Sequence, residues 1–177
     1  AATASVGGWA LAHIHGGDRA EGIADEAMRH AITKLAHLHF PATEQSRERI
    51  LRMGENPEFV FNVGSPAIDG LDAIPAMSDA EYQKLGSPTT VFLLHPSGRD
   101  AATEHALAAR VLAMLSADQS TGSKGAGVLA MYPNHDAGRD GILAAIRSWT
   151  AGLGKPDDQG RCAVEHLPRD RFVGLLK

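Results

Sequence analysis

Cysteine is almost missing from this 177-residue chain, in which Cys162 stands alone. A single cysteine excludes an internal disulfide framework and is typical of proteins in a reducing compartment, so we expect a cytoplasmic protein. Long apolar runs are missing too. The apolar stretch AATASVGGWALA at residues 1–12 has no positively charged start, which a secretory signal would need, and it is shorter than the roughly 20 apolar residues of a membrane span.

The chain also lacks clusters of positive charge. The formal net charge is −4 and the chain has no long basic run, so the sequence offers no electrostatic footprint for nucleic acid or for an anionic membrane. We therefore expect neither as a partner. Hydrophobic residues make up 44% of the chain and charged residues 21%, which is enough apolar surface for the core of one domain or two small ones.

The two ends of the sequence suggest a longer parent protein. The chain begins without Met, and it ends on FVGLLK, an apolar segment that stops in mid-pattern. We expect these residues to be the middle portion of a larger protein. Near the N-terminus, the glycines at 7 and 8 predict a loop that runs into a buried strand over Trp9 to Ile14.

Apolar residues alternate between strand-like and helix-like spacing along the chain. Helices are predicted behind ADE at 24–26, from Thr43 as N-cap to Gly54 as C-terminal stop, and in the Ala/Leu-rich stretch after residue 100. Further helices are predicted from residues 138 and 169. Strands are predicted in WALAHI, LHFPAT, EFVFNVGSP, TTVFLL, AGVLAMY and CAVEHLP.

Strands that alternate with helices of ten or more residues imply parallel sheets, because a parallel pair needs a long crossover connection. The sequence therefore predicts the α/β class. Residues 65–88 mix proline, glycine and short helical pieces, as connectors between domains do, and we place a boundary between residues 66 and 67.

Polar residues follow three of the predicted strands. In parallel α/β sheets, ligands bind beyond the carboxyl ends of the strands, where loops and helix N-termini present free N–H groups. HGGD, HPSG and YPNHDAG occupy such positions. We therefore expect one rim to carry the side chains of His15, Asp18, His95, Asn134 and Asp136.

Four motifs occur together in one order: HIHGGDRAEGIADEAMRHAITKLAHLHF, GENPEFVFNVGSPAID, the HP of LLHPSG, and YPNHDAG. In type, order and approximate spacing they resemble the hydrolysing UDP-N-acetylglucosamine 2-epimerases of sialic and nonulosonic acid biosynthesis. The resemblance runs through nearly all of the chain. Agreement of four separate motifs is far more specific than any one of them alone.

The resemblance implies a two-domain fold like that of the B-type glycosyltransferases, with Rossmann-like parallel sheets and a UDP-sugar as substrate. Residues 1–66 would be the C-terminal part of the first domain, and residues 67–177 the N-terminal part of the second, UDP-binding domain. The family's reaction removes the C2 proton, expels UDP to leave a glycal, and adds water to give the free 2-epimeric sugar. The resemblance implies no cofactor and no metal, and a homo-oligomeric parent, either a dimer or a tetramer.

The resemblance also assigns roles on the catalytic side. Asp25, in ADEAMRH, matches the family's catalytic carboxylate, with Glu26 the weaker choice, and Arg29 one turn later suits a phosphate or the carboxylate itself. Many relatives have glutamate where His15 stands, so either His15 or Asp18 would take over the acid–base role. Without the family, Asp25 reads as an ordinary first-turn carboxylate and His15 as a structural residue in a glycine turn.

On the nucleotide side, His95 matches the family histidine that contacts the diphosphate, and Asn134 and Asp136 match the UDP-binding region. Taken alone, His95 is a polar strand end, and the other two residues are common in turns before glycine.

Two other readings stay open. The first is a metal-dependent hydrolase, because nitrogen and oxygen ligands recur at loose zinc-like spacing. The second is a non-catalytic binder of sugar nucleotides, favoured by the missing glutamate. The candidate metal ligands are His13, His15, Asp18, Asp25, His37 and His39.

Overall fold

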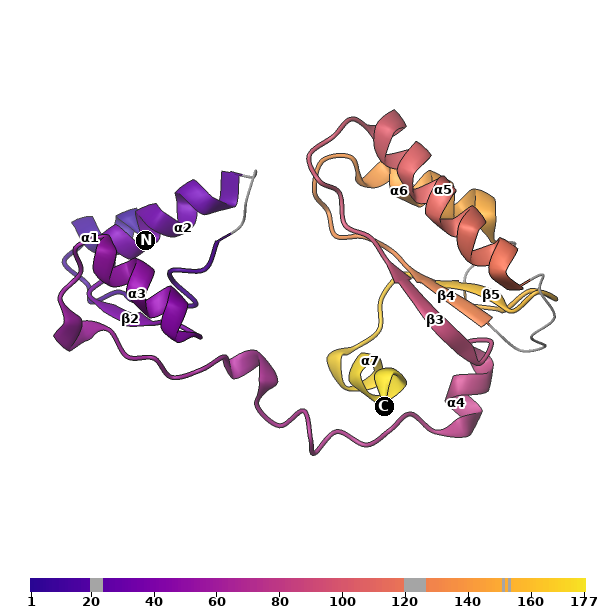
Figure 1. Cartoon of the computed structure of the whole chain (residues 1–177), viewed down its shortest axis with the longest axis horizontal. Helices are drawn as coiled ribbons and strands as arrows, with labels where there is room; N and C mark the ends of the chain where they lie inside the picture. The colour runs from indigo at the N-terminus through magenta and orange to yellow at the C-terminus, as the bar shows by residue number, and fades with distance from the viewer. Residues whose placement is uncertain (20–23, 120–126, 151, 153) are drawn as a thin grey trace. The chain divides into compact units, whose positions relative to one another are not determined.

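The computed structural model describes residues 1–19, 24–119, 127–150, 152 and 154–177. The chain divides into two compact units, Ala1–Leu71 and Asp72–Lys177 (Figure 1). Both are built on parallel strands, so the predicted α/β class is confirmed. The predicted boundary between residues 66 and 67, and the assignment of each side to part of a parent domain, stay predictions.

The first unit is a small βαβ structure in which helix α2 connects two parallel strands, β1 and β2. Its elements are α1 (Ala2–Val6), β1 (Ala12–Ile14), α2 (Ala24–Leu35), β2 (Leu38–Phe40), α3 (Glu44–Arg52), and the 3-10 turns η1 (Pro57–Phe59) and η2 (Pro66–Ile68). Helix α3 starts where the sequence predicts, because the Thr43 hydroxyl accepts from the backbone N–H of Ser46 at 3.1 Å. Gly54, with φ +90°, follows the end of the helix, also as predicted.

Two predictions for this unit are wrong. The glycines at 7 and 8 lie in a loop as predicted, but helix α1 precedes them, and the strand expected over Trp9 to Ile14 is restricted to Ala12–Ile14, with Trp9 70% exposed. The predicted strand in EFVFNVGSP is also missing from the described residues. The Asn56 side chain caps a 3-10 turn that has proline at its start, and only an isolated bridge from Val60 to His39 remains of strand pairing.

The second unit is a three-stranded parallel sheet in the order β3-β4-β5. Helices α5 and α6 pack against each other, and their apolar side chains cover one face of the sheet (Figure 1). Its elements are α4 (Asp79–Lys84), β3 (Pro88–Leu93), α5 (Ala101–Gln119), β4 (Gly127–Met131), α6 (Arg139–Trp149), β5 (Arg161–Val164) and α7 (Arg169–Leu176).

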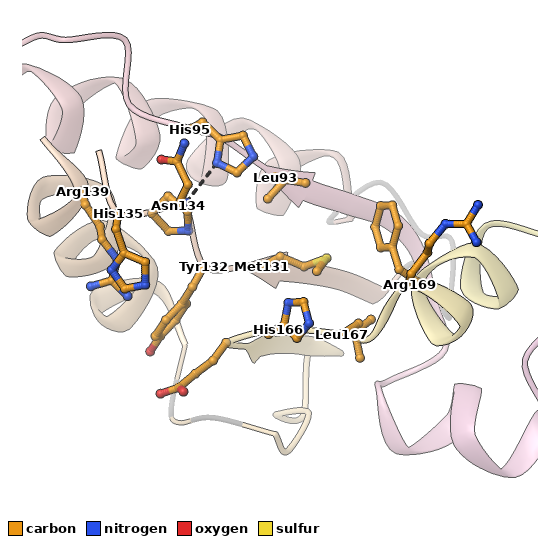
Figure 2. Close-up of a pocket in the computed structure, with 13 residues that line it drawn as sticks. Leu93, His95, Met131, Tyr132, Asn134, His135, Arg139, His166, Leu167 and Arg169 are labelled. Atoms are coloured by element: carbon orange, nitrogen blue, oxygen red, sulfur yellow. Dashed lines mark hydrogen bonds between the residues drawn. The ribbon is translucent and has the colours of Figure 1, made fainter. Parts of the chain in front are cut away.

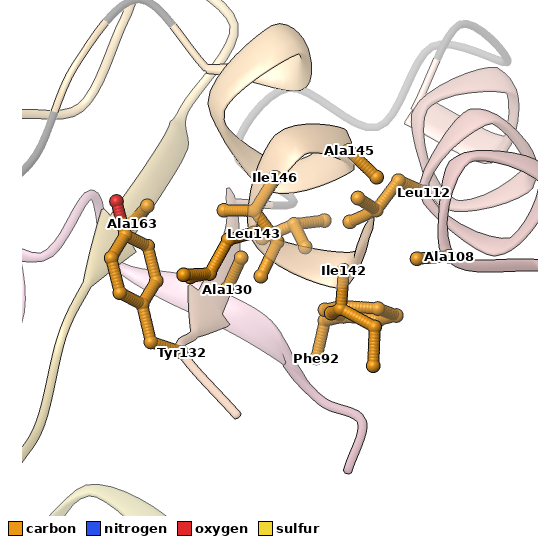
Figure 3. Close-up of a cluster of buried hydrophobic side chains, with 11 residues drawn as sticks. Phe92, Ala108, Leu112, Ala130, Tyr132, Ile142, Leu143, Ala145, Ile146 and Ala163 are labelled. Carbon is orange, nitrogen blue, oxygen red and sulfur yellow. The ribbon is translucent and has the colours of Figure 1, made fainter. Parts of the chain in front are cut away.

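The central strand β4 is buried on both faces. Val128 and Ala130 belong to a core shared with α5 and α6. Figure 3 shows Ala130 in this core with Leu112 and Ile146. Leu129 and Met131 belong to a second cluster on the other face, with Leu85, Cys162 and Leu167, against which Phe172 of α7 packs. A strand with both faces covered needs a continuous apolar run, and GVLAM provides one. The carboxyl ends of the three strands are thereby fixed side by side.

Candidate active site

The loop after β1 carries the HGGD motif in a tight conformation. His15 has φ +60°, a left-handed backbone that costs a non-glycine residue about 1–3 kcal/mol. Gly17 has φ +79°, and a Cβ atom there would overlap the Ser46 carbonyl oxygen, so only glycine fits. The backbone N–H of His15 donates to the Phe40 carbonyl at 3.0 Å, which ties the loop to the end of β2.

His15 and Asp18 contact each other in this loop. Nδ1 of His15 lies 3.3 Å from Oδ2 of Asp18, and the Ser46 hydroxyl donates to the other Asp18 oxygen at 2.6 Å. The second ring nitrogen, Nε2, is 2.9 Å from the hydroxyl of Ser65. The side chains of His15 and Asp18 are 35% and 31% exposed, so the pair is held by the protein and still reachable from solvent.

Asp25 and Arg29 lie on helix α2, one turn apart. Asp25 is exposed in the first turn of the helix, and Arg29 is half-buried. Residues 20–23, which join the HGGD loop to this helix, lie outside the described residues. The charge of Arg29 contributes to lowering the pKa of His13, after burial and the charge of His39.

His13 and His39 are buried opposite each other on β1 and β2. Nδ1 of His13 is 3.0 Å from the hydroxyl of Thr33, which itself donates to the Arg29 carbonyl, so His13 is the donor. Nε2 of His39 is 3.3 Å from Oε2 of Glu55. Burial lowers the pKa of both histidines, and the Glu55 carboxylate opposes this for His39. These are neutral histidines that hold helix α2 and Glu55 to the sheet.

Four of the candidate metal ligands, His13, His15, Asp18 and His39, are therefore engaged by protein groups. His37 likewise accepts from the backbone N–H of Leu11 at 3.2 Å. Within the described ranges, no group of three or more His, Cys, Asp or Glu side chains is arranged to hold a metal ion. Nor does any helix in the described part of the chain combine the length and apolar character that crossing a bilayer requires.

The second unit has a cavity of about 680 Å³ at the carboxyl ends of its three strands. Residues after β3, β4 and β5 line it, together with the first turns of α6 and α7 (Figure 2). This is the position that parallel α/β sheets use for ligands. The lining residues are Leu93, His95, Met131, Tyr132, Pro133, Asn134, His135, Arg139, Glu165, His166, Leu167, Arg169 and Phe172.

His95 and Asn134 lie together at this cavity, as predicted. The backbone N–H of Asn134 donates to Nδ1 of His95 at 3.0 Å, the bond drawn dashed in Figure 2. A neutral imidazole that accepts at Nδ1 carries its proton at Nε2, so His95 presents an N–H donor. Asp136 lines a neighbouring depression, where its carboxylate accepts from the Asn134 amide at 2.7 Å. Asp136 thus orients Asn134 rather than lining the main cavity.

Sequence reasoning missed several cavity residues. The lining has two positive charges, on Arg139 and Arg169, and one carboxylate, on Glu165. Phe172 adds an aromatic side chain. The strand-end rule that selected His95 also selects Glu165 and His166, since both directly follow β5. The arginines and Phe172 begin the following helices, and no local pattern marked them. With its histidine donors, the cavity suits an anionic ligand with a flat apolar part.

Glu104 is another residue that the sequence did not reveal. This fully buried carboxylate of α5 accepts from the backbone N–H of Ser97 at 2.7 Å and from the Ser97 hydroxyl at 3.0 Å. The Ser97 backbone bond is the main cause that lowers the pKa of Glu104, so the carboxylate stays ionised. A Cβ on Gly138 would lie 3.0 Å from Glu104 Cγ, so Glu104 contacts the loops after both β3 and β4.

Comparison with known proteins connects both units to one family. Residues 1–177 match the family model described as UDP-N-acetylglucosamine 2-epimerase. The chain is 30% identical over 171 residues to UDP-N,N'-diacetylbacillosamine 2-epimerase (hydrolyzing) of Legionella pneumophila, covering 94% of this chain and 42% of that protein. It is 28% identical over 154 residues to UDP-N-acetylglucosamine 2-epimerase of Neisseria meningitidis, covering 82% of this chain and 38% of that protein. The chain thus spans less than half the length of these relatives.

Solved structures show the same fold at lower sequence identity. The S. aureus MnaA–UDP co-structure superposes with a TM-score of 0.72 at 15% identity, covering 97% of this chain and 44% of that one. The Methanocaldococcus jannaschii UDP-GlcNAc 2-epimerase, in complex with UDP-GlcNAc and UDP, gives a TM-score of 0.69 at 14% identity, covering 97% of this chain and 47% of that one. The predicted Rossmann-like parallel sheets of a B-type glycosyltransferase-like fold are confirmed.

Proposed function

Because this chain belongs to the UDP-N-acetylglucosamine 2-epimerase family, we propose that the protein carrying it is a hydrolysing UDP-sugar 2-epimerase. The reaction removes the proton at C2 of the sugar, expels UDP to leave a glycal, and adds water to release the free 2-epimeric sugar. Of the two curated relatives described above, the Legionella protein has the hydrolysing reaction in its name.

The observation that carries this proposal is the cavity at the ends of β3, β4 and β5. Its Nε2–H donor on His95 and the cations of Arg139 and Arg169 suit a diphosphate, whose charge increases as the sugar–oxygen bond breaks. Asn134 is oriented by Asp136 to make a polar contact with the nucleotide. Phe172 offers an apolar face for the base. This part of the chain would hold UDP before and after the elimination.

The acid–base groups would come from the first unit. Asp25, exposed at the start of α2, is the first candidate to carry the proton at C2 or C3, with Arg29 as its cationic neighbour. His15, paired with Asp18, stands where many relatives have a catalytic glutamate. An imidazole held by a carboxylate can accept and return a proton, so this pair would supply the second acid–base group.

Two sugar nucleotides are candidate substrates. One is UDP-N-acetylglucosamine, with N-acetylmannosamine as the free product, and the other is a 2,4-diacetamido-trideoxy analogue, the class named in the Legionella relative. Both share the 2-acetamido group and the diphosphate on which the proposed chemistry depends. A product of either kind would feed sialic or related nonulosonic acid synthesis.

The test uses the full-length protein with each UDP-sugar, and mass spectrometry of the products. The proposal expects equal amounts of UDP and of a free 2-epimeric sugar from one of the two substrates. A product that keeps its UDP would mean an epimerase that does not hydrolyse. Tight binding of both UDP-sugars without turnover would identify a non-catalytic binder instead.

A further inference from the structure

Five side chains of the first unit form one continuous run of hydrogen bonds. The Thr43 hydroxyl donates to the Ser46 hydroxyl at 2.9 Å, and the Ser46 hydroxyl donates to Oδ1 of Asp18 at 2.6 Å. Oδ2 of Asp18 contacts Nδ1 of His15 at 3.3 Å, and Nε2 of His15 contacts the Ser65 hydroxyl at 2.9 Å. Residues far apart in the sequence thus meet in a serine–histidine–aspartate arrangement.

The direction of each proton in this run follows from its neighbours. An ionised Asp18 can only accept, so His15 carries its proton on Nδ1. The neutral ring then has a lone pair on Nε2, and this lone pair accepts the proton of Ser65. The Ser65 oxygen in turn accepts from the backbone N–H of Ala67 at 3.2 Å. Each hydroxyl uses its single proton once, and no two donors oppose each other.

Ser65 is badly placed to act as a nucleophile, although the arrangement resembles a hydrolase triad. An acyl intermediate would need backbone N–H groups near the serine for the oxyanion. Within the described Ser65–Ile68 turn, Pro66 has no N–H, that of Ala67 is bonded to Ser65 itself, and that of Ile68 donates to the Ser65 carbonyl. The hydroxyl is therefore better suited to passing protons than to attacking carbon.

We propose that Ser65 is a catalytic residue that acts together with His15, and that protons enter and leave His15 through the Ser65 hydroxyl. This rests on the proposed acid–base role of His15. The only unprotonated nitrogen of the ring faces Ser65, so a proton from the substrate side reaches His15 by way of this hydroxyl. The half-exposed side chain of His15 and the half-buried position of Ser65 leave the serine accessible to small groups.

The proton transfer balances for the water that adds to the glycal. As the water O–H bond breaks, its proton goes to the Ser65 oxygen, and the original Ser65 proton goes to Nε2 of His15. The C1=C2 double bond of the glycal opens in the same addition: the water oxygen bonds to C1, and C2 takes a proton that the His15 imidazolium, stabilised by the Asp18 carboxylate, delivers through the Ser65 hydroxyl. Ser65 carries one proton before and after, and His15 ends with the charge with which it began. No other reactant is needed.

The kinetic test compares variants of the full-length protein with the UDP-sugar that it turns over. Ser65→Ala should lower kcat by about tenfold or more with KM changed less than twofold, since general acid–base groups contribute about 10²–10⁴-fold. Ser65→Thr keeps the hydroxyl and should restore most of kcat. Asn56→Ala is the matched control, because Asn56 caps the neighbouring 3-10 turn in the same way without contacting a histidine.

A double mutant separates a role through His15 from a general structural role. If Ser65 acts through His15, adding Ser65→Ala to His15→Ala should cost no further activity. Equal losses from Ser65→Ala in both backgrounds would overturn the proposal. A kcat of Ser65→Ala equal to the parent's, with His15→Ala impaired, would also overturn it while leaving the epimerase assignment intact.

A second measurement does not depend on turnover. Nitrogen-15 NMR of labelled histidine in the full-length protein reports which ring nitrogen carries the proton. The proposal expects His15 in the Nδ1–H form at pH 7.5, with this preference reduced in Ser65→Ala. A His15 that carries its proton on Nε2 in the unaltered protein would overturn the relay even if no UDP-sugar is consumed.

Discussion

The backbone N–H of Asn134 donates to Nδ1 of His95 at 3.0 Å, which joins the loops that follow β3 and β4. The bond fixes the imidazole and directs its remaining proton to Nε2. A neutral histidine so held is a hydrogen-bond donor for an anion without carrying a charge of its own. The positive charge of the cavity lining comes from Arg139 and Arg169.

His95→Ala should therefore weaken UDP binding by about tenfold, or roughly 1.4 kcal/mol. Isothermal titration of UDP into the full-length protein measures this. His105→Ala, on α5 and outside the lining of the cavity, is the control and should bind UDP as the parent does. Equal affinities for the parent and His95→Ala would remove His95 from the diphosphate site.

Asp25→Asn should impair catalysis rather than UDP binding. If this carboxylate carries a proton in the reaction, kcat should fall by roughly a hundredfold or more while UDP affinity changes little. Glu26→Gln is the matched control, since Glu26 lies one residue away and its carboxylate is 3.6 Å from Arg19. Comparable, mild losses in both variants would show that neither carboxylate transfers the proton.

The buried histidines predict a loss of stability in mild acid. Burial lowers the pKa of His13 and His39 below the ordinary value of 6.5, so the unfolded chain binds protons there that the folded chain does not. Above about pH 6.5 these two histidines cost the folded chain no stability. Below that pH the free energy of unfolding falls, by up to about 1.4 kcal/mol per pH unit for each histidine.

Chemical denaturation of the full-length protein between pH 7.5 and 5.0 measures that slope. Replacing both histidines, as His13→Gln with His39→Gln, should lower stability at pH 7.5 and flatten the dependence on pH. An unchanged slope in the double variant would mean that the two rings are not the groups that titrate.

Glu104→Ala should disturb the cavity indirectly, through the loops after β3 and β4 that Glu104 contacts. The change removes the acceptor for the Ser97 backbone N–H and leaves a hole beside Gly138. We expect a Tm lower by at least about 2 °C and weaker UDP binding, although Glu104 does not line the cavity. Glu104→Gln retains an acceptor oxygen and should lie between the two. Calorimetry with and without UDP checks both effects.

Much of the second unit could be predicted from local sequence. The apolar run of β4 and the polar residues after β3 and β4 placed His95 and Asn134 at the sheet edge, because strand ends in parallel sheets follow a general rule. Arg139, Arg169 and Phe172 could not be found that way. Their place in the lining depends on how α6 and α7 start, which is a property of packing rather than of any short motif.

Less of the first unit could be predicted from its sequence. His15 and Asp18 are three residues apart, so their contact was within reach of sequence reasoning. Ser65 is 50 residues from His15, and only the folded chain shows that they meet. The expected strand near Val60 was lost because Asn56 and Pro57 favour a capped turn, and the pattern of apolar residues alone does not weigh that preference.

Proton NMR of the full-length protein with each UDP-sugar in deuterium oxide tests the central claim most directly. The account predicts loss of one UDP-sugar, appearance of free UDP, and a released 2-epimeric sugar that carries deuterium at C2, because that position is deprotonated and then refilled from solvent. Recovery of a 2-epimer still attached to UDP, or of a released sugar with its original proton at C2, would contradict it.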